Sequence, residues 1–353
     1  MSKEAVQVIV RTRPTSNFAQ NCLKIDTEKN TIEVKMEKAK GQAINNQQEN
    51  WNFKLDKILH NASQEAVFDI AARDIVDSVM EGYNGTILAY GQTGAGKTFT
   101  MNGGTQSYQH RGVVPRALGH LFRCINAKPE VASVVRLSYI EIYNETYYDL
   151  LAEPGVAQPE LAVRDRADGV VEVKGLTKLV AESEEAALNH LFTGETNRAI
   201  AQHQMNANST RSHCIFTIYL ESRSRIESSE KVVMAKLNMV DLAGSERVGK
   251  TGSTGMTLKE AQYINKSLTF LEQVVIALAN KKRDHIPFRQ SKLTNLLRDS
   301  LGGNCKTRMI ANIWAEKEQL DETISTLKFA LRMMRISNEA TVNVQLDPLV
   351  LLK

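Results

Sequence analysis

The sequence predicts an α/β fold in which helices flank both faces of a central sheet. Apolar runs typical of strands alternate along the chain with stretches of helical periodicity, and this alternation is typical of α/β proteins. The 353 residues, 42% of them hydrophobic, suffice to bury a sizeable core. Neither an internal repeat nor a sustained heptad pattern divides the chain, so we expect one large domain over residues 1–334.

Each predicted element follows from its local pattern. Apolar runs rich in β-branched and aromatic residues predict strands at 5–10, 86–89, 134–143, 214–220, 232–240 and 307–313. The fourth and fifth of these are expected to form a hairpin. Apolar residues at helical spacing predict helices at 63–80, after Lys97, at 257–280 and at 320–334. Polar or proline-bounded stretches predict exposed loops at 35–50 and 154–159.

Composition narrows the class of protein. No apolar run approaches the roughly 18 residues of a membrane span. The start of the chain, Met1–Glu4, lacks an apolar signal region, so we expect an intracellular protein without a membrane partner. The cysteines show no metal-binding spacing and are expected to be reduced and buried: Cys22, Cys124, Cys214 and Cys305.

A basic segment stands out at residues 281–292. Its five cations and one anion give a net charge of +4, the same excess that the whole chain carries. The residues alone leave two interpretations open. The segment is either a solvated loop or a footprint for an acidic surface, on nucleic acid or on an acidic protein.

The strongest motif is Tyr-Gly-Gln-Thr-Gly-Ala-Gly-Lys-Thr at residues 90–98, which matches the phosphate-binding loop G-x-x-x-x-G-K-[ST]. Its glycines let backbone N–H groups turn toward phosphate oxygens. Lys97 is expected to reach the β- and γ-phosphates, and the Thr98 hydroxyl to ligate Mg²⁺. The motif predicts a nucleoside triphosphate site, without deciding the nucleotide, at Gln92, Thr93, Gly94, Ala95, Gly96, Lys97 and Thr98.

Two further polar segments have the chemistry to complete that site. Asp241 and Gly244 form a D-x-x-G pattern directly after a predicted strand. The carboxylate is therefore positioned to accept from Mg²⁺-bound water, and the glycine N–H to approach the γ-phosphate. Residues 206–213 carry hydroxyls and Arg211, although in isolation they indicate only a polar turn.

Together these residues resemble the kinesin motor domain, a motor fold of the P-loop NTPase type. The resemblance covers roughly residues 5–346 and rests on segments that occur in the family's order: 11–14, 90–98, 208–213, 241–246, 263–268 and 285–294. It implies ATP and ADP with Mg²⁺ rather than GTP. In keeping with this, residues 280–283 depart from the guanine-reading motif N-K-x-D at its last position.

The resemblance also implies roles for single residues. Arg11, Arg13 and Pro14 would pack around adenine, with Tyr90 and Phe99 nearby.

The implied catalytic residues are Ser209, Thr210, Arg211, Asp241, Gly244 and Glu246. Ser209 and Thr210 would form a first switch that contacts attacking water and Mg²⁺; Thr210 replaces a serine of many kinesins but keeps the hydroxyl. Arg211 and Glu246 would pair to close the site, and Glu246 would help to pass a proton through water. The implied metal ligands are Thr98, Thr210 and, through water, Asp241.

A microtubule partner is implied in the same way. In kinesins the long helix, the loop before it and the basic segment after it lie on tubulin, which favours an acidic protein over nucleic acid as the partner of the basic segment. The expected contacts are Lys250, Arg283, Arg289 and Lys292, with Arg164 and Arg166 in a peripheral loop.

Residues 335–346 resemble the neck linker of plus-end-directed kinesins, and 347–353 the start of a stalk through which the full-length protein would dimerise. Docked as an edge strand once ATP closes the switches, the linker would bury Ile336 and latch through Asn343; a disordered tail is the alternative. Only Met1–Glu4 precede the first expected strand, so the cover strand that pairs with such linkers is expected to be short, which leaves force output open.

Within the family, the sequence is most similar to the kinesin-nine group of cilia and flagella, on segments such as 194–198 and 285–290, which implies an axonemal cytoskeleton. Two other functions stay open. A microtubule-depolymerising kinesin is disfavoured, since neither its Lys-Val-Asp loop tip nor its N-terminal neck is found in this sequence. A non-motile, ATP-regulated microtubule-binding protein would use the same nucleotide site.

Overall fold

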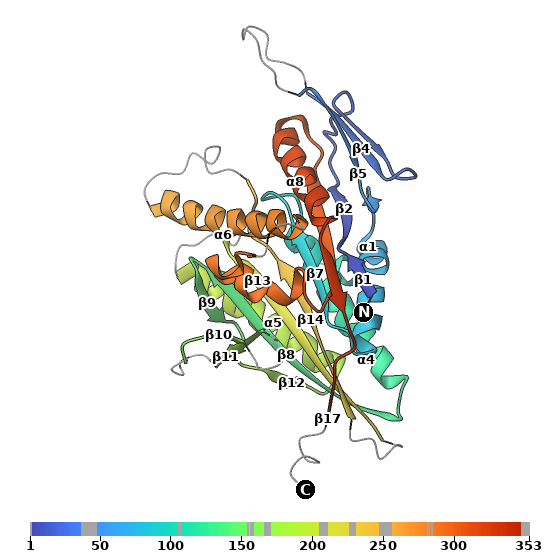
Figure 1. Cartoon of the computed structure of the whole chain (residues 1–353), viewed down its shortest axis with the longest axis vertical. Helices are drawn as coiled ribbons and strands as arrows, with labels where there is room; N and C mark the ends of the chain where they lie inside the picture. The colour runs from blue at the N-terminus through green and yellow to red at the C-terminus, as the bar shows by residue number, and fades with distance from the viewer. Residues whose placement is uncertain are drawn as a thin grey trace.

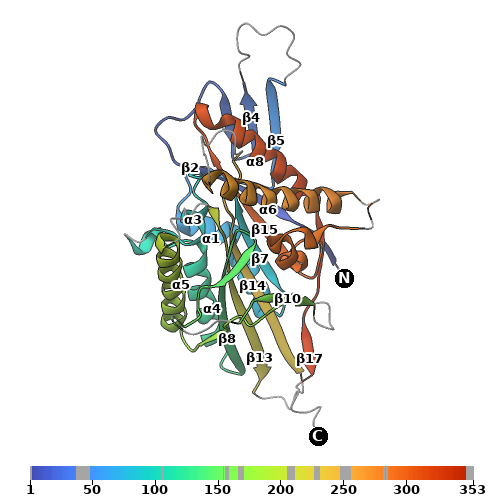
Figure 2. The same ribbon diagram turned by 90° about the vertical axis from the view of Figure 1, so that its left-hand side faces the viewer.

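The computed structural model describes residues 2–36, 48–104, 107–153, 155, 159–165, 171–204, 211–225, 231–246, 256–280, 283 and 285–346. These residues form three layers, with a large sheet between two layers of helices (Figures 1 and 2). A buried apolar cluster on each face of the sheet joins it to the helices on that face. The predicted α/β class is confirmed.

The central sheet is 10-stranded and mixed. Its main path runs through β12 (Leu179–Ala181), β8 (Val131–Tyr143), β13 (His213–Ser224), β14 (Lys231–Asp241), β7 (Gly85–Tyr90), β15 (Lys306–Trp314), β2 (Gln7–Arg13) and β6 (Lys57–Leu59). Off this path, β9 (Thr146–Asp149) pairs with β8 and β17 (Val344–Leu346) with β14. β13 and β14 form the expected hairpin, whereas β14, β7, β15, β2 and β6 run parallel. Their carboxyl ends therefore meet at one edge, which is where ligand sites form in such sheets.

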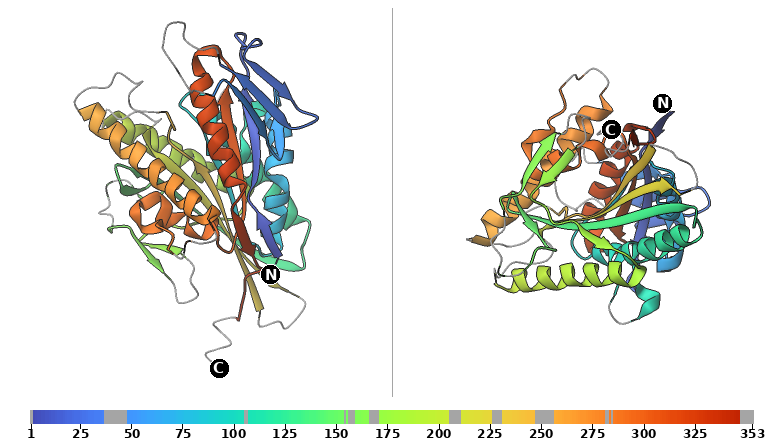
Figure 3. Two further views of the ribbon diagram at one scale, coloured as in Figure 1. Left: turned by 45° about the horizontal axis from the view of Figure 1, so that its top comes forward. Right: turned by 90° about the horizontal axis from the view of Figure 1, so that it is seen from below.

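Two helical layers cover the sheet (Figure 3). One contains α1 (Gln64–Ala71), α2 (Arg73–Met80), α4 (Val113–Asn126) and α5 (Glu184–Gln204); the other contains α6 (Met256–Ala279), α7 (Lys292–Leu296) and α8 (Leu320–Met333). The short α3 (Lys97–Met101) starts from the phosphate-binding loop, and 3₁₀ turns lie at Tyr108–His110, Phe288–Gln290, Arg298–Ser300 and Lys317–Gln319. Among the described residues, no helix combines the length and the apolar character that crossing a bilayer requires.

One helix prediction is wrong in its extent. The helix expected over 63–80 is two helices, α1 and α2, because Ala72 leaves the helical region at φ −137°. The Ala72 N–H still donates to the carbonyl oxygen of Phe68 and so caps α1, while the side chain of Ser63 caps the other end. The break lets both short helices bury an apolar face against the sheet.

Three smaller sheets accompany the central one, and the sequence analysis missed two of them. β3 (Leu23–Asp26), β4 (Thr31–Lys35) and β5 (Asn50–Lys54) form one of them, so much of the loop expected at 35–50 is the connection of a β-hairpin whose residues 37–47 lie outside the described residues. β10 (Ala162–Asp165) and β11 (Val171–Lys174) form the second. β1 (Ser2–Ala5) and β16 (Ser337–Ala340) form the third, a pairing of a short first strand with the segment after α8 like the one that the resemblance implied.

The segment after α8 lies along the sheet. The strand expected at 5–10 is interrupted at Val6, whose N–H donates to the carbonyl oxygen of Ile336 at 2.9 Å; β1 precedes it and pairs with β16. Ile336 is fully buried among core residues. Farther on, β17 pairs with the first residues of β14, beyond the point where β7 begins. The C-terminal segment is thus an ordered edge of the fold as far as residue 346.

Asn338 fixes β16 to the body of the protein. Its side-chain amide donates to the carbonyl oxygens of Ser300 (3.0 Å) and Cys305 (2.7 Å) and to the Thr307 hydroxyl (2.9 Å). Its side-chain oxygen accepts from the N–H of Gly302 at 2.8 Å. The side chain is 1% exposed, so no water can replace these bonds if they are lost.

We expect Asn338→Ala to lower the free energy of unfolding by about 2–4 kcal/mol, because it leaves several buried polar groups without a partner. The measurement is urea denaturation of the purified chain. Glu339→Ala is the matched control on the same strand: Glu339 pairs only at the surface with Lys3 (3.4 Å), so its loss should stay within about 0.5 kcal/mol. Equal effects of the two substitutions would contradict the anchoring role of Asn338.

Candidate nucleotide site

The phosphate-binding loop joins the end of β7 to the start of α3, and its glycines meet different demands. Gly91 has φ 146°, and a Cβ there would lie 2.2 Å from the carbonyl oxygen of Asn312. At Gly94, with φ 82°, a Cβ would lie 2.7 Å from the Trp314 ring. At Gly96, with φ 96°, a Cβ would meet nothing within 4 Å. Steric crowding therefore requires glycine at positions 91 and 94, whereas Gly96 borders open space.

That space is a cleft of about 440 Å³, a volume typical of small-molecule sites. The cleft is enclosed by residues at the end of β2, in the phosphate-binding loop, in α3, before β13 and at the end of β14. They are Arg13, Pro14, Thr93, Gly94, Gly96, Lys97, Thr98, Phe99, Ser212, Asp241 and Leu242. The structure thus brings together most of the predicted phosphate-binding residues with Asp241.

Two buried charges define the electrostatics of the cleft. The Lys97 ammonium donates to the carbonyl oxygen of Gln92 at 3.0 Å, and Thr98 Oγ1 donates to Asp241 Oδ2 at 2.6 Å. Burial lowers the pKa of Lys97 and raises that of Asp241, and in both cases the charge of the other group opposes the shift. Lys97 therefore supplies positive charge where water cannot screen it.

The donors present fit a magnesium ion bound with a nucleotide. Asp241 Oδ1 is buried and has no hydrogen-bond partner among the described residues, although a buried carboxylate oxygen normally has one. The Thr98 hydroxyl lies against the other oxygen of the same carboxylate. Hydroxyl and carboxylate oxygens are the ligands that Mg²⁺ and its water shell prefer.

The segment after β14 folds back onto the phosphate-binding loop. The Ser245 N–H donates to the carbonyl oxygen of Gly91 at 3.2 Å. Both carboxylate oxygens of Glu246 accept from Thr93, from its N–H at 2.8 Å and its hydroxyl at 2.6 Å. A Cβ at Gly244 would lie 2.3 Å from side-chain oxygens of both Glu246 and Thr93, so a larger residue there would displace this hydrogen-bonded pair. Glu246 is therefore turned toward the phosphate-binding loop. Its expected pairing with Arg211 stays a prediction.

His213 connects two parts of the site, a role that the sequence analysis did not assign to it. Its Nδ1 accepts from the N–H of Ala243 at 3.1 Å, and its Nε2 lies 2.8 Å from the hydroxyl of Ser267 on α6. This pattern requires a neutral ring with the proton on Nε2. Burial, together with the charge of Lys97, lowers the pKa of His213 to about 3. The imidazole therefore joins the D-x-x-G segment to the long helix without carrying charge.

Of the residues expected to contact adenine, Arg13, Pro14 and Phe99 line the cleft, whereas Arg11 does not. Arg13 lies over the Trp314 ring at 4.1 Å and donates to the carbonyl oxygen of Gly94 at 2.6 Å, while Pro14 and Phe99 line the cleft. Arg11 lies behind Phe99, 5.5 Å from its ring centre.

The expected place of Tyr90 is corrected by the structure. As the last residue of β7, Tyr90 turns into the core and stacks on Phe329 of α8, with ring centroids 4.2 Å apart. Burial raises the pKa of its hydroxyl. Tyr90 therefore lies on the helix side of the loop rather than beside the nucleotide cleft.

The predicted partner-binding residues are only partly described. Arg283, Arg289 and Lys292 are exposed beyond the end of α6, and the Lys292 ammonium lies 5.0 Å from the Tyr147 ring centre. Arg164 is exposed on β10, on the same side of the molecule as α6 (Figures 1 and 2). Four predicted site residues lie outside the described residues: Arg166, Ser209, Thr210 and Lys250.

Comparison with known proteins supplies the family. The family model of the kinesin motor domain matches residues 11–336. The chain belongs to the kinesin motor-domain family.

Among curated proteins, the kinesin-like protein KIF9 of Mus musculus is 51% identical over 350 residues, which cover 98% of this chain and 44% of that protein. Kinesin-like protein KLP1 of Chlamydomonas reinhardtii is 51% identical over 354 residues, covering 100% and 45%. The chain thus spans less than half of the length of these relatives. A solved structure described as that of a fast kinesin has a TM-score of 0.85 and 37% identity, covering 98% of this chain and 95% of that one.

We expect Lys97→Ala to weaken the binding of MgADP more than about 100-fold, or about 3 kcal/mol, because the buried ammonium faces the space for the phosphates. Isothermal titration calorimetry measures the affinity. Lys24→Ala, at an exposed site on β3, is the control and should bind as the wild type does. Wild-type affinity in Lys97→Ala would remove Lys97 from the site.

A second expectation concerns acid. Below pH 6.5 the unfolded chain protonates His213, whereas the folded chain keeps it neutral to about pH 3. The free energy of unfolding should therefore decrease as the pH is lowered. His213 should contribute about 1 kcal/mol of this decrease per pH unit between pH 6 and pH 4. In His213→Asn, the free energy of unfolding, measured in urea across this range, should fall less steeply by that amount. An unchanged slope would contradict a neutral, buried His213.

Proposed function

We propose that this kinesin motor domain is a microtubule-stimulated ATPase that converts ATP hydrolysis into movement toward the microtubule plus end. Bound Mg²⁺ would neutralise phosphate charge during phosphoryl transfer, with Thr98 and Asp241 as its described protein partners. Thr210 is proposed as a further ligand, and Ser209 as a contact of the attacking water. The domain limits proposed are 1–334 for the motor and 335–346 for the linker.

The support for hydrolysis is the group of residues around the cleft. Lys97 contributes buried positive charge, and Gly96 leaves room for a phosphate beside it. Gly244 lies beside Thr93 of the loop, and its N–H is proposed to donate to the γ-phosphate. Phosphoryl transfer requires mainly positioning and charge neutralisation, and these residues can supply both.

The observation that carries the motor proposal is that one strand serves the cleft and the linker. β14 ends at Asp241, in the nucleotide cleft, and its first residues pair with β17 of the linker. A second connection passes from Tyr90 at the loop to Phe329 on α8, the helix that leads to Ile336. Displacement of the cleft residues would therefore reach the linker through rigid elements.

The proposed direction of movement and cellular location follow from the arrangement of the linker and from the relatives. A linker placed after the catalytic core, together with a cover strand β1 paired to β16, favours plus-end movement by resemblance to other kinesins. The likeness to KIF9 and to KLP1 of Chlamydomonas reinhardtii supports a role in cilia or flagella. Dimerisation through a stalk beyond residue 346 belongs to the same proposal.

The proposed tubulin contact is the face that carries α6 and the basic residues after it. Another structural neighbour, with 34% identity and a TM-score of 0.84, covers 97% of each chain and is described as a KIF14 dimer in complex with a microtubule. Arg283, Arg289 and Lys292 present exposed positive charge on this face, with Lys250 and Arg166 proposed beside them. Contacts between exposed charges are screened by salt, so binding should weaken as ionic strength rises.

The test is steady-state ATP turnover with and without polymerised microtubules at two salt concentrations. We expect strong stimulation that fades with salt, and a higher microtubule requirement for Arg283→Ala than for Lys24→Ala, because only Arg283 lies on the proposed face. An ATP turnover rate that is the same with and without microtubules would be consistent with an ATPase but would contradict the motor proposal.

Glu246→Ala separates hydrolysis from binding. It should retain MgATP but turn it over very slowly, since the carboxylate that holds Thr93 is lost. Gliding of polarity-marked microtubules over the surface-bound chain then tests movement and direction. Stimulated turnover without gliding would favour the alternative, a non-motile, ATP-regulated microtubule-binding protein.

A further inference from the structure

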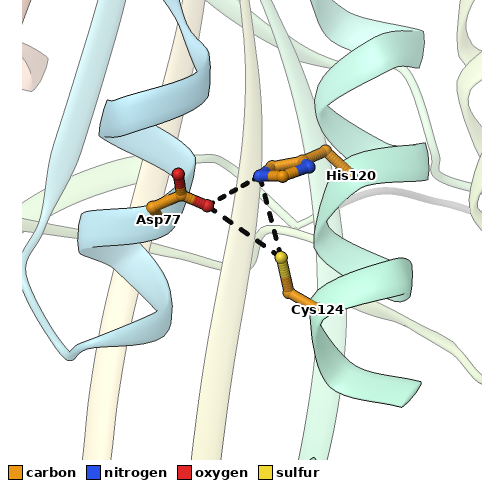
Figure 4. Close-up of side chains that lie close together, drawn as sticks. All are labelled: Asp77, His120 and Cys124. Atoms are coloured by element: carbon orange, nitrogen blue, oxygen red, sulfur yellow. Dashed lines mark hydrogen bonds and ion pairs between the residues drawn. The ribbon is translucent and has the colours of Figure 1, made fainter. Parts of the chain in front are cut away.

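Three side chains with metal-binding atoms meet between α2 and α4, outside the nucleotide cleft (Figure 4). Asp77 lies on α2, while His120 and Cys124 are four residues apart on α4 and so share one helix face. His120 Nε2 is 2.6 Å from Asp77 Oδ1, and Cys124 Sγ is 3.7 Å from Nε2 and 3.9 Å from Oδ1. All three atoms point to a common centre.

These distances are close to those of a tetrahedral site. With metal–oxygen and metal–nitrogen bonds near 2.0–2.1 Å and a metal–sulfur bond near 2.3 Å, ligand atoms lie about 3.3–3.6 Å apart. The two distances to sulfur exceed this by only a few tenths of an ångström. The Asp77–His120 distance must open by about 0.7 Å, which replacing their hydrogen bond by two metal bonds would do.

The surroundings fix the orientation of His120 and leave Asp77 accessible to solvent. The Phe68 ring packs edge-on against His120, at 5.9 Å between centroids, so the imidazole is oriented by packing. The side chain of His120 is 12% exposed and that of Asp77 is 49% exposed. A metal here would therefore be reached from solvent and would keep a water molecule as its fourth ligand.

We propose that Asp77, His120 and Cys124 form a binding site for Zn²⁺ or a similar transition-metal ion. The ligands, one nitrogen, one thiolate and one carboxylate, are of the types that bind zinc. On binding, the thiol proton leaves to solvent as the sulfur–metal bond forms, and the imidazole proton moves from Nε2 to Nδ1. Carboxylate and thiolate together balance the dication, so the closed site is neutral.

One neighbour opposes this arrangement. Arg73 Nη1 lies 3.4 Å from His120 Nδ1 and can donate to it in the metal-free protein. With a metal on Nε2, Nδ1 carries a proton and two donors face each other. The Arg73 side chain is half-exposed; it pairs with Asp69 and lies over the Phe68 ring at 5.3 Å. Exposed contacts of these kinds each contribute about 1 kcal/mol or less, so the side chain can turn away at modest cost. The site would be strengthened by an acceptor at this position.

The experiment titrates Co²⁺ into the intact chain with its nucleotide site saturated by MgADP. We expect one equivalent to give thiolate-to-cobalt charge-transfer absorption, and Zn²⁺ to displace it. Cys124→Ser should abolish the absorption and weaken Zn²⁺ binding, measured by chelator competition, at least about 100-fold; Asp77→Asn and His120→Gln should each weaken it about 10-fold or more. Unchanged circular dichroism and MgADP affinity would establish that the variants fold.

Cys22→Ser is the matched control, because Cys22 is also a partly exposed thiol but packs against the apolar cluster on the other face of the sheet from α4. It should keep both the absorption and the affinity. Absence of charge transfer at millimolar Co²⁺, or equal Zn²⁺ affinity in Cys124→Ser and wild type, would overturn the site. Arg73→Gln should bind Zn²⁺ several-fold more tightly; unchanged or weaker binding would contradict Nε2 as the ligand atom.

Discussion

The fold depends on keeping an ammonium and a carboxylate buried at the carboxyl edge of parallel strands. Lys97 and Asp241 are each less than one-tenth exposed, and burying isolated charges is costly. Each reduces the cost of the other, and the carbonyl of Gln92 and the hydroxyl of Thr98 satisfy part of their hydrogen bonding. The remaining capacity, above all at Asp241 Oδ1, is directed into the cleft. The protein therefore holds a strongly polar surface that a nucleotide and its metal can complete.

The residues around that surface form a connected mechanical unit. Glu246 and Ser245 attach the D-x-x-G segment to the phosphate-binding loop, and His213 attaches the same segment to α6. Because the imidazole is neutral and buried, this connection does not vary with pH over the physiological range or with salt. Displacement of Ala243 would pull on Ser267 in the middle of α6, the helix of the proposed tubulin face.

Local motifs predict the chemistry of the site, and tertiary packing decides the rest. The phosphate-binding loop and D-x-x-G were located from sequence because each is a continuous segment whose spacing is set by the ligand. Tyr90 was misplaced because the orientation of the last strand residue depends on α8, more than 200 residues later. His213 and Ser267 are 54 residues apart, and Asp77 and His120 are 43 apart, so neither contact leaves a local pattern.

The same contrast between local pattern and tertiary packing explains which strands and helices could be predicted. Strands with strongly apolar runs were found, whereas the alternating β3–β4–β5 sheet was missed, because half of its side chains are polar and face solvent. The break at Ala72 between α1 and α2 could not be predicted, because no glycine or proline marks it in the sequence. The break follows from packing two helix faces onto a twisted sheet, which is a property of the assembled fold.

The proposed linker, residues 335–346, is held more firmly in its first half than in its second. Its first half is firmly fixed: Ile336 and Asn338 are buried, and β1 covers β16. Its second half has Val342 and Val344 nearly half exposed. Beyond the strand pairing with β14 it is held by hydrogen bonds: the N–H and side-chain amide of Asn343 donate to the carbonyl oxygen of Gly82, and Asn304 bonds to both Asn343 and the Thr341 N–H. Few buried contacts mean a small free energy of docking for that half. If residues 335–346 act as the proposed linker, changes in the position of β14 or of the Gly82 turn would therefore release this half before the first half.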